Sequence, residues 1–332
     1  MTQTNEDSIT YKVSVIVPTY NRLARLKKVL IGLEQQTYPL SDFEVIIVSD
    51  GSTDGTHQFL ETIETPLQLK FIEQANQGVS VARNHGVDEA IGDMIVFLDD
   101  DVVPQPQLIV EHLKSHDPNK ADAVVLGPYI PPLDFKLTPW SQWEQDKLLQ
   151  LYAAMVDGSV MPSERHYVSG NSSLPRRLII DAGGFDPDFR RYEDLEFSYR
   201  LKKQNTRFLF NEKAGGYHYS ERSFASWLDI PYVYGRNDVL FTKQKDHGWL
   251  LPTVLRESTE RHSFVRALVW LCLDRPFFSK MSIAGLKMIG KSNRRLGLFA
   301  YSGIFNLRYY QGIADELGGR SVFYKAIAQA IA

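Results

Sequence analysis

Cysteine is almost absent from this sequence: 332 residues contain one, Cys272. A single thiol can neither close an intramolecular disulfide nor build a multi-thiolate zinc or iron–sulfur site. This usage fits a reducing compartment, so we expect a cytoplasmic protein. Long apolar runs are also missing, since one of the longest charge-free stretches, residues 296–307, spans only 12 residues. A membrane helix needs roughly 20, and we therefore expect no transmembrane segment.

The sequence also lacks the marks of a secreted, fibrous or disordered chain. It starts with MTQTNEDSIT, where a signal peptide would have a basic start and an apolar run. With 22 glycines and 16 prolines it is neither collagen-like nor of low complexity. Hydrophobic residues make up 43% and charged residues 23%, which is typical of a globular protein with a sizeable core. We expect a polar tail over residues 1–10 and folded structure from residue 11.

Acidic residues are scarce near the carboxyl end, although the net charge of the chain is only −3. Residues 251–332 carry 12 Lys and Arg against five Asp and Glu, whereas residues 1–250 carry 25 against 35. A basic region rich in aromatic residues is typical of contact with anionic lipid, here on the inner face of a membrane, or with a lipid-linked substrate. The alternative is a packed helical tail with a solvated basic face. We expect no nucleic-acid partner.

Short runs rich in Val and Ile alternate with helical patterns in the first part of the chain. Between the first two runs, residues 22–36 repeat apolar side chains at helical spacing. Alternation of this kind predicts right-handed βαβ crossovers and a parallel sheet buried on both faces. Such sheets bind ligands beyond the carboxyl ends of their strands. The predicted strands are residues 13–17, 43–48, 67–72, 94–98 and 123–126.

A proline-rich stretch, residues 127–139, follows the last of these strands and predicts a boundary or a loop over the sheet edge. Helical patterns return at residues 140–155, 193–203 and 223–244, and residues beyond 250 read as wholly helical. We therefore expect one α/β domain over residues 11–250, with a nucleotide-binding half to about 127 and an acceptor half from 128. A basic helical extension is predicted for residues 251–332.

Three adjacent carboxylates, Asp99, Asp100 and Asp101, follow the strand predicted at residues 94–98. Each pair repels by roughly 1 kcal/mol in water and by more in a shielded crevice, so we expect a positive charge beside them. In an extended segment Asp99 and Asp101 share one face and Asp100 lies on the other. Hard oxygen ligands suit Mg²⁺ or Mn²⁺. The alternative is a solvated acidic loop or helix cap before Pro104.

Two further polar segments follow predicted strands. PTYNR begins at Pro18 after the first strand, and DGSTDGT begins at Asp50 after the second. In the second segment the glycines permit a tight turn, and Thr53 or Asp54 is placed to cap the next helix, whose free N–H groups favour anions. A capped turn without a ligand is the alternative. Neither segment is a Walker loop, because no Gly-Lys-Ser/Thr follows.

Taken together, these segments resemble the inverting family-2 glycosyltransferases of the GT-A fold. The resemblance rests on VSVIVPTYNR, EVIIVSDGSTDGT, ANQGVSVARNHG and GDMIVFLDDDVVP, which span about residues 13–104. It resumes at SGN from Ser169, at GGFD from Gly183 and at Glu193-Asp194. The resemblance implies an α/β fold with a Rossmann-like, mainly parallel sheet flanked by helices; here a helical carboxyl-terminal extension follows it.

The resemblance also implies roles for individual residues. Asp101 is the expected ligand of a divalent cation, Mn²⁺ or Mg²⁺, with Asp99 and His218 completing the metal site. Gly170 and Asn171 are expected beside the sugar and the acceptor. The remaining residues implied to bind the nucleotide-sugar donor are Pro18, Thr19, Tyr20, Asn21, Arg22, Asp50, Gly51, Arg83, Asp99 and Asp100.

Glu193 and Asp194 open a predicted helix and match the family's catalytic motif. The resemblance implies that Asp194 is the catalytic base, with Glu193 beside it. A carboxylate in the first turn of a helix is stabilised in its charged form by the helix dipole, which a base requires near neutral pH. From the residues alone, a capping cluster is the alternative.

We therefore expect an inverting glycosyltransferase of the hexosyltransferase type. It would transfer a sugar from a UDP-sugar to a hydroxyl of a glycan or lipid-linked acceptor, in the synthesis of a polysaccharide, glycolipid or cell-envelope glycan. One alternative is a catalytically silent subunit that binds nucleotide-sugars, which could dispense with Glu193 and Asp194. Another is a nucleotidyltransferase, which would show a glycine-rich, Lys- or Arg-bearing loop after the first strand.

Overall fold

The computed structural model describes residues 12–331 except 118, 121, 190 and 245–247; the tail predicted at residues 1–10 lies outside the described residues. The chain forms two compact units. The first runs to Phe135 and includes Leu148–Tyr219, and the second consists of Lys136–Lys147 and the chain from Ser220 onward. The second unit thus begins before residue 250, where we expected the α/β domain to end. The predicted domain bounds, 11–250 and 251–332, stay a prediction.

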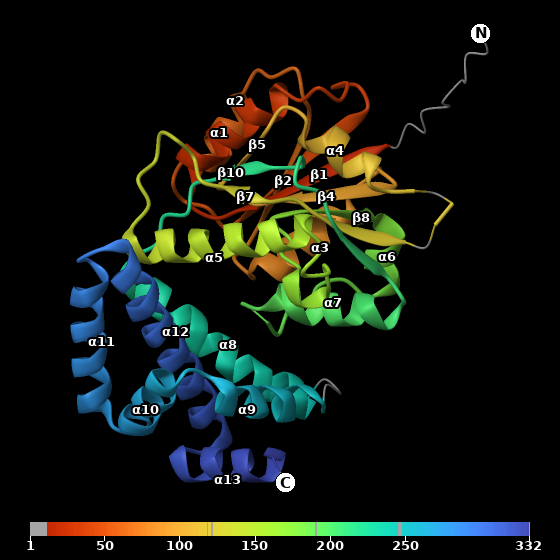
Figure 1. The fold of residues 1–332 in the computed structure, drawn as a ribbon. Helices are drawn as coiled ribbons and strands as arrows, with labels where there is room; N and C mark the ends of the chain where they lie inside the picture. Colours follow the sequence, from red (N-terminus) through yellow and green to blue (C-terminus); the bar gives the residue numbers. More distant parts are fainter. Residues whose placement is uncertain (1–11, 118, 121, 190, 245–247, 332) are drawn as a thin grey trace. The chain divides into compact units, whose positions relative to one another are not determined.

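A seven-stranded sheet organises the first unit (Figure 1). Its strand order is β3-β2-β1-β4-β8-β6-β9, and β1 pairs in parallel with both β2 and β4. Only β8 runs antiparallel to its neighbours, so the predicted mainly parallel sheet is confirmed. The strands are β1 (Val13–Thr19), β2 (Phe43–Asp50), β3 (Gln68–Gln74), β4 (Met94–Leu98), β6 (Ala123–Leu126), β8 (Asn171–Pro175) and β9 (Arg207–Phe210).

Helices cover both faces of this sheet because strand side chains alternate between the faces. Val15 and Val45 pack on one side against α1 (Leu23–Glu34), α2 (Thr56–Thr62) and α4 (Leu108–Lys114). Ile16 and Ile46 pack on the other side. The helices on that side are α3 (Val79–Asp88), α6 (Arg176–Asp181) and α7 (Glu193–Lys203). The central strands β1, β2, β4 and β6 are therefore buried on both faces, as the near-continuous apolar runs predicted, whereas the edge strand β3 is partly exposed.

A second, three-stranded sheet takes one of its strands, β7, from the proline-rich stretch where only a boundary or a loop was expected. It consists of β5 (Val102–Pro104), β10 (Gly216–His218) and β7 (Tyr129–Ile130), in the order β5-β10-β7. The strands have two or three residues each, too few for a periodic signal. Because β10 is antiparallel to β5 and pairs His218 with Val102, it brings His218 next to the aspartate triplet. Between β7 and β8 the chain forms α5 (Pro139–Val156) and a 3₁₀ turn (Glu164–His166).

Helices make up the described part of the second unit from α8 onward. Gly235 and Gly312 allow α8 and α12 to cross closely, since a Cβ at either residue would lie 2.0 Å from a backbone oxygen of the other helix. Trp227 and Tyr301 are fully buried in the core of this unit. No helix in the described ranges combines the length and apolar character needed to cross a membrane. The helices are α8 (Phe224–Gln244), α9 (Leu250–Glu260), α10 (Ser263–Cys272), α11 (Pro276–Gly290), α12 (Arg294–Leu317) and α13 (Arg320–Ile331).

A buried histidine joins α4 to β8 in the first unit. His112 is fully buried, with Nε2 2.9 Å from Asn171 Oδ1 and Nδ1 3.0 Å from Ser173 Oγ. Burial lowers the pKa of His112 to about 4, because a charged imidazole would lose its hydration inside the protein. The histidine therefore stays neutral in the folded protein at pH values where the unfolded chain already binds a proton.

We predict that this histidine makes the fold sensitive to mild acid. Because its pKa is lower in the folded state, its contribution to stability is complete above about pH 6.5 and is lost as the pH falls towards 4. Between pH 7 and 5 the free energy of unfolding should fall by about 2 kcal/mol more in the unmodified protein than in His112→Gln. Urea unfolding at the two pH values measures this difference. Equal losses in both proteins would contradict the prediction.

Candidate active site

Several predicted site residues meet at one edge of the large sheet. β1 ends at Thr19 and the adjacent, parallel β4 ends at Leu98, so the segments that follow both strands lie at the same edge. The antiparallel β8 begins there as well, because Asn171 pairs with Leu98. The backbone N–H of Asp99 donates to the carbonyl of Gly170 at 3.0 Å. The SGN segment therefore lies at the same edge of the sheet, where we expected a ligand to bind.

The aspartate triplet forms a tight turn rather than an extended segment. Val102 N–H donates to the carbonyl of Asp99 at 3.0 Å, which closes the turn. The prediction that Asp99 and Asp101 share a face is therefore wrong. Arg22 donates instead to Asp100 at 3.0 Å and to Asp101 at 2.7 Å, and so supplies the expected positive charge.

Asp100 lies deepest of the three in its surroundings. Its second carboxylate oxygen accepts a hydrogen bond from Thr19 Oγ1 at 2.8 Å. Burial raises the pKa of Asp100 to about 7, although the neighbouring Arg22 favours the charged form. The turn is thus held by Thr19, the last residue of β1, and by Arg22, which follows it.

Arg83, on α3, joins Asp99 to the predicted catalytic motif, Glu193 and Asp194. Its side chain is only 4% exposed. One guanidinium nitrogen lies 3.0 Å from Asp99 Oδ1, and the other lies 2.8 Å from Glu193 Oε1 and 3.4 Å from Asp194 Oδ1. A buried arginine of this kind is stabilised by its carboxylates, because an unpaired charge in the interior costs several kcal/mol. One guanidinium therefore gathers three carboxylates from two distant parts of the chain.

Glu193 and Asp194 lie in the first turn of α7, as predicted. The Asp194 side chain is 26% exposed and that of Glu193 is 9% exposed, so Asp194 is the more accessible to a substrate. Ser169 Oγ donates to Asp194 Oδ1 at 2.5 Å. Burial raises the pKa of both carboxyl groups, and Arg83 opposes this rise by favouring their charged forms. The pair shares one cation and so titrates as a unit.

The two predicted donor-binding segments are joined by direct hydrogen bonds. Asn21, in a left-handed conformation with φ 53°, donates from its backbone to Ser52 Oγ at 3.0 Å and accepts from Thr53 N at 2.7 Å. Pro18 lies in β1, and Tyr20 is half exposed. The PTYNR and DGST segments therefore form one continuous surface at the ends of β1 and β2.

Asp50 holds the loop that precedes α3. Its carboxylate accepts hydrogen bonds from the backbone N–H groups of Gln77 and Gly78 at 2.8 and 2.9 Å, and from the Gln74 side chain at 2.8 Å. Gly51 has φ 78°, and a Cβ there would lie 2.9 Å from the backbone nitrogen of Asn76. Asp50 and Gly51 are thus part of the loop architecture, and their contact with a nucleotide stays a prediction.

The predicted metal ligands are only partly brought together. Asp101 Oδ1 lies 3.7 Å from His218 Nε2, and the His218 ring packs against Tyr129 with ring centres 4.5 Å apart. Asp99 faces Arg83 instead. Across the described residues, no three His, Cys, Asp or Glu side chains are close enough together to hold a metal ion. The Asp101–His218 pair fits two donors of a cation such as Mg²⁺ or Mn²⁺, which takes its other ligands from water or substrate phosphates.

One predicted role requires correction, and another stays a prediction. Asn171 does not face a sugar: it is fully buried, and its amide donates to the carbonyls of Pro128 and Ala214 at 3.2 and 2.9 Å. Its amide at the start of β8 satisfies these two carbonyl groups inside the protein. Arg83 is buried among carboxylates rather than presented to a diphosphate, and direct donor contact by Arg83 stays a prediction.

Gly170 has a packing role that its sequence context did not reveal. A Cβ at this residue would lie 2.0 Å from Asp99 Oδ2 and 2.3 Å from the Tyr129 hydroxyl. Tyr129 and Ser169 were not predicted as site residues. Tyr129 lies in a two-residue strand without a pattern, whereas Ser169 directly precedes the predicted Gly170. Position beside a predicted site residue was the only available signal for Ser169, and Tyr129 had none.

Together, the fold and the site define an open α/β protein with a cluster of acidic residues at the carboxyl ends of its strands. The family model described as Glycosyl transferase family 2 matches residues 14–183, about half of the chain. The chain therefore belongs to glycosyl transferase family 2, and the predicted family is confirmed.

Relatives and solved structures are consistent with this assignment. Over 215 residues the chain is 34% identical to validoxylamine A glucosyltransferase from Streptomyces hygroscopicus subsp. jinggangensis, covering 57% of this chain and 51% of the relative. It thus spans about half the length of that relative. It is 28% identical over 242 residues to hyaluronan synthase of Pasteurella multocida, covering 62% of this chain and 24% of the synthase.

Solved structures share the GT-A-like fold at low identity. The mannosyltransferase PcManGT from Pyrobaculum calidifontis, in complex with GDP-Man and Mn²⁺, has a TM-score of 0.61 at 17% identity; the match covers 92% of this chain and 88% of that chain. S. aureus TarS 1–349 in complex with UDP has a TM-score of 0.52 at 20% identity, with 90% of each chain covered.

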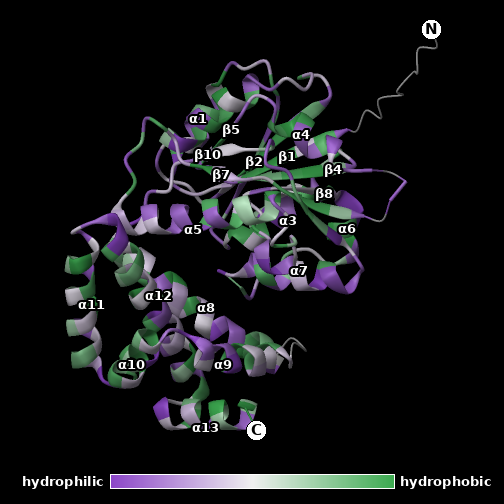
Figure 2. Cartoon of the chain, viewed as in Figure 1, coloured by the Kyte–Doolittle hydropathy of each residue, from purple (hydrophilic) through white to green (hydrophobic). Residues whose placement is uncertain are grey.

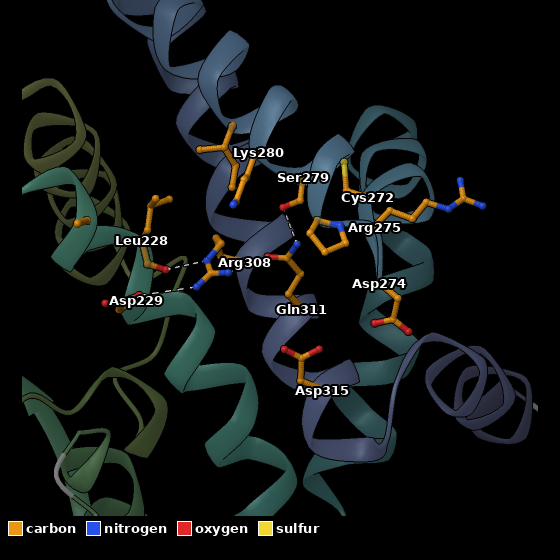
Figure 3. A pocket seen from close by; sticks show the side chains of 13 residues that line it. Leu228, Asp229, Cys272, Asp274, Arg275, Ser279, Lys280, Arg308, Gln311 and Asp315 are labelled. Atoms are coloured by element: carbon orange, nitrogen blue, oxygen red, sulfur yellow. Dashed lines mark hydrogen bonds and ion pairs between the residues drawn. The ribbon is translucent and has the colours of Figure 1, made fainter.

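A separate cavity of about 680 Å³ lies within the second unit (Figure 3). Arg308 donates to the carbonyl of Leu228 at 3.2 Å and faces Asp229 at 3.7 Å, and Gln311 donates to Ser279 at 2.8 Å. Acidic and basic side chains line it together, and none of the predicted site residues is among them. The cavity therefore has no single charge preference that would identify a ligand.

We predict that Gly170→Ala disrupts the site from within. The new methyl group would push Asp99 or Tyr129 aside, and overpacking of this kind costs about 1 to 3 kcal/mol of stability. Gly285→Ala in α11 is the matched control, because a Cβ at Gly285 meets nothing within 4 Å and helical alanine is favourable. Urea unfolding compares the two. A Gly170→Ala protein as stable as Gly285→Ala would contradict this packing.

Proposed function

We propose that this chain transfers a sugar from a nucleoside-diphosphate sugar to an acceptor hydroxyl with inversion at the anomeric carbon. The observation that carries the proposal is the group formed by Arg83, Asp99, Glu193 and Asp194. It joins the carboxylates that follow β4 to an accessible carboxylate at the start of α7. A donor at the strand ends and a base beside it are what a single displacement requires.

We assign the donor to the surface formed by the ends of β1 and β2. This surface includes Pro18 to Arg22 together with Asp50 and Gly51. The proposal is supported by the fold neighbours, which were solved in complex with UDP, UDP-GlcNAc or GDP-Man. We propose a UDP-sugar for this chain. The position also agrees with the general rule that open α/β sheets bind ligands beyond the carboxyl ends of their strands.

Asp194 is the base in this proposal. Arg83 and Ser169 both donate to its Oδ1, and we assign Oδ2 to the proton of the acceptor hydroxyl. As the acceptor oxygen forms its bond to the anomeric carbon, the bond from that carbon to the diphosphate oxygen breaks, and the electron pair leaves with the diphosphate. The proton passes to Asp194. One displacement inverts the anomeric centre, so no covalent sugar intermediate forms.

Asp101 and His218 would hold a divalent cation, Mn²⁺ or Mg²⁺. When bound, such a cation supplies positive charge to the leaving diphosphate. Arg22 already neutralises part of the charge on Asp100 and Asp101, which keeps the turn compact before any donor arrives. The choice of metal is supported by PcManGT, which was solved with Mn²⁺.

We propose a hydroxyl on a glycan or a lipid-linked glycan as the acceptor. Support comes from the names of the relatives, which include a hyaluronan synthase and a chondroitin synthase that are 28% and 26% identical to this chain over part of their length. The accessible face of Asp194 lies on α7, in the part of the chain that follows the donor-binding segments. Inversion requires the acceptor to approach the anomeric carbon from the side opposite the leaving diphosphate, and we assign that approach to this face.

We predict that Asp194→Asn lowers the transfer rate by about 10²- to 10⁴-fold, the usual contribution of a general base. Donor affinity, measured by calorimetry with Mn²⁺ present, should hardly change, because the variant keeps the size of the side chain. In the unmodified protein the rate should also fall in acid, with a limb above the ordinary pKa of aspartate, because burial raises the pKa of Asp194.

Glu193→Gln is the matched control and should lower the rate less. NMR of the freshly formed product reports inversion or retention directly. If Glu193→Gln loses the rate while Asp194→Asn keeps it, the two roles are exchanged. If the unmodified protein binds the donor but transfers nothing to any acceptor tested, the result favours a catalytically silent subunit that binds nucleotide-sugars.

A further inference from the structure

Helix α11 exposes a continuous apolar face. Met288 is 75% exposed, Phe277 71% and Met281 61%, and Phe278 and Ile289 are nearly half exposed. At 100° per residue these side chains fall on one side of the helix, and Ala284 and Gly285 between them are also exposed. Hydrophobic residues predominate along α11 in Figure 2. A soluble helix normally has the opposite arrangement, with its apolar side towards the core.

The inner face of α11 carries hydroxyl groups instead. Ser279 is buried and accepts a hydrogen bond from Gln311 on α12 at 2.8 Å. Ser282 lies 3.3 Å from the sulfur of Cys272 on α10. Leu286 completes the packed side. Because the inner face is satisfied by packing and hydrogen bonds within its own unit, the apolar outer face is left for a different environment.

The charge along the chain segment that contains α11 has one sign, although Asp229, Asp274 and Asp315 line the cavity on the inner side. Residues 275–314 contain seven Lys and Arg and no Asp or Glu. Four of the seven belong to α11 or its ends: Lys280 and Lys287, seven residues apart on one flank, and Arg275 and Lys291 at the two termini. Just before α11, Trp270 is 56% exposed and lies within cation–π distance of Arg275. Exposed apolar side chains bordered by cations and an aromatic ring are typical of helices that lie in the surface of a bilayer.

We propose that α11 binds a membrane surface rich in anionic lipid, with Phe277, Met281 and Met288 inserted among the acyl chains. The flanking lysines then meet lipid phosphates. A second copy of this chain fits the face less well, because two α11 helices packed together would bring their cations near one another without any acidic partner in this segment. The inference does not depend on the reaction proposed for the first unit.

A fluorophore placed on this face tests the proposal directly. Cys272, the one native cysteine, is buried, so a cysteine added at the surface is labelled selectively. Met288→Cys and the control Met161→Cys are matched, since their methionines are 75% and 76% exposed. An environment-sensitive dye at residue 288 should brighten about twofold or more on phosphatidylcholine vesicles containing phosphatidylglycerol. It should respond little to phosphatidylcholine alone, and the dye at residue 161 should not respond.

Co-sedimentation with the same vesicles measures the affinity. Phe277→Ser/Met281→Ser should bind anionic vesicles about tenfold or more weakly than the unmodified protein, whereas Leu133→Ser/Met161→Ser should bind unchanged. Binding should weaken as salt shortens the screening length from about 10 Å at 0.1 M. Equal binding to neutral and anionic vesicles would overturn the proposal.

A dye at residue 288 that responds to protein concentration alone, together with a dimer in sedimentation, would also overturn it in favour of a second copy. If the double variant does not fold, as judged by circular dichroism, the proteins labelled at residue 288 or 161 decide. A dye at residue 288 that stays in water on anionic vesicles then refutes the proposal.

Discussion

One buried arginine holds the candidate site of this glycosyl transferase family 2 chain together. Arg83 contacts Asp99, which follows a strand of the sheet, and Glu193 and Asp194, which begin a helix more than 90 residues later. The guanidinium needs these carboxylates because it is removed from water, and the carboxylates need it because burial favours their neutral forms. The site therefore forms as a unit: if Arg83 is removed, the buried carboxylates are left without their cation.

The rest of helix α3 extends this constraint. Asn84 both donates to and accepts from the backbone of Phe185 at 2.7 Å, and Ser80 donates to the carbonyl of Phe189 at 3.0 Å. α3 thus holds the chain that leads to α7 at several places, and Arg83 fixes the start of α7 itself. Tyr192, just before α7, has a left-handed backbone with φ 71°, a strain that such surroundings can impose. The segments that we propose for the donor and for the acceptor are connected through one helix.

Local patterns predicted the parts of this structure that depend on local physics. The apolar run of β4 and the helix at Glu193–Lys203 match their predicted bounds, and the aspartates lie at a strand end as the parallel sheet requires. The antiparallel β8 was missed because its sequence, NSSLP, is short and polar, although it is buried in the sheet. The turn at Asp99 and the partners of Arg83 depend on contacts between residues far apart in the chain, which periodicity does not report. Asn171 was misassigned for the same reason: its partners lie on other segments.

The central claim is that Arg83 and the carboxylates stabilise one another, and a double-mutant cycle on the free energy of unfolding tests it most directly. Arg83→Met alone should cost about 3 to 5 kcal/mol, because it leaves buried carboxylates without their cation. In a Glu193→Gln background, where one of those charges is already absent, the same substitution should cost less by at least about 1 kcal/mol. If Arg83→Met costs the same in both backgrounds, the two side chains are energetically independent and the account is contradicted.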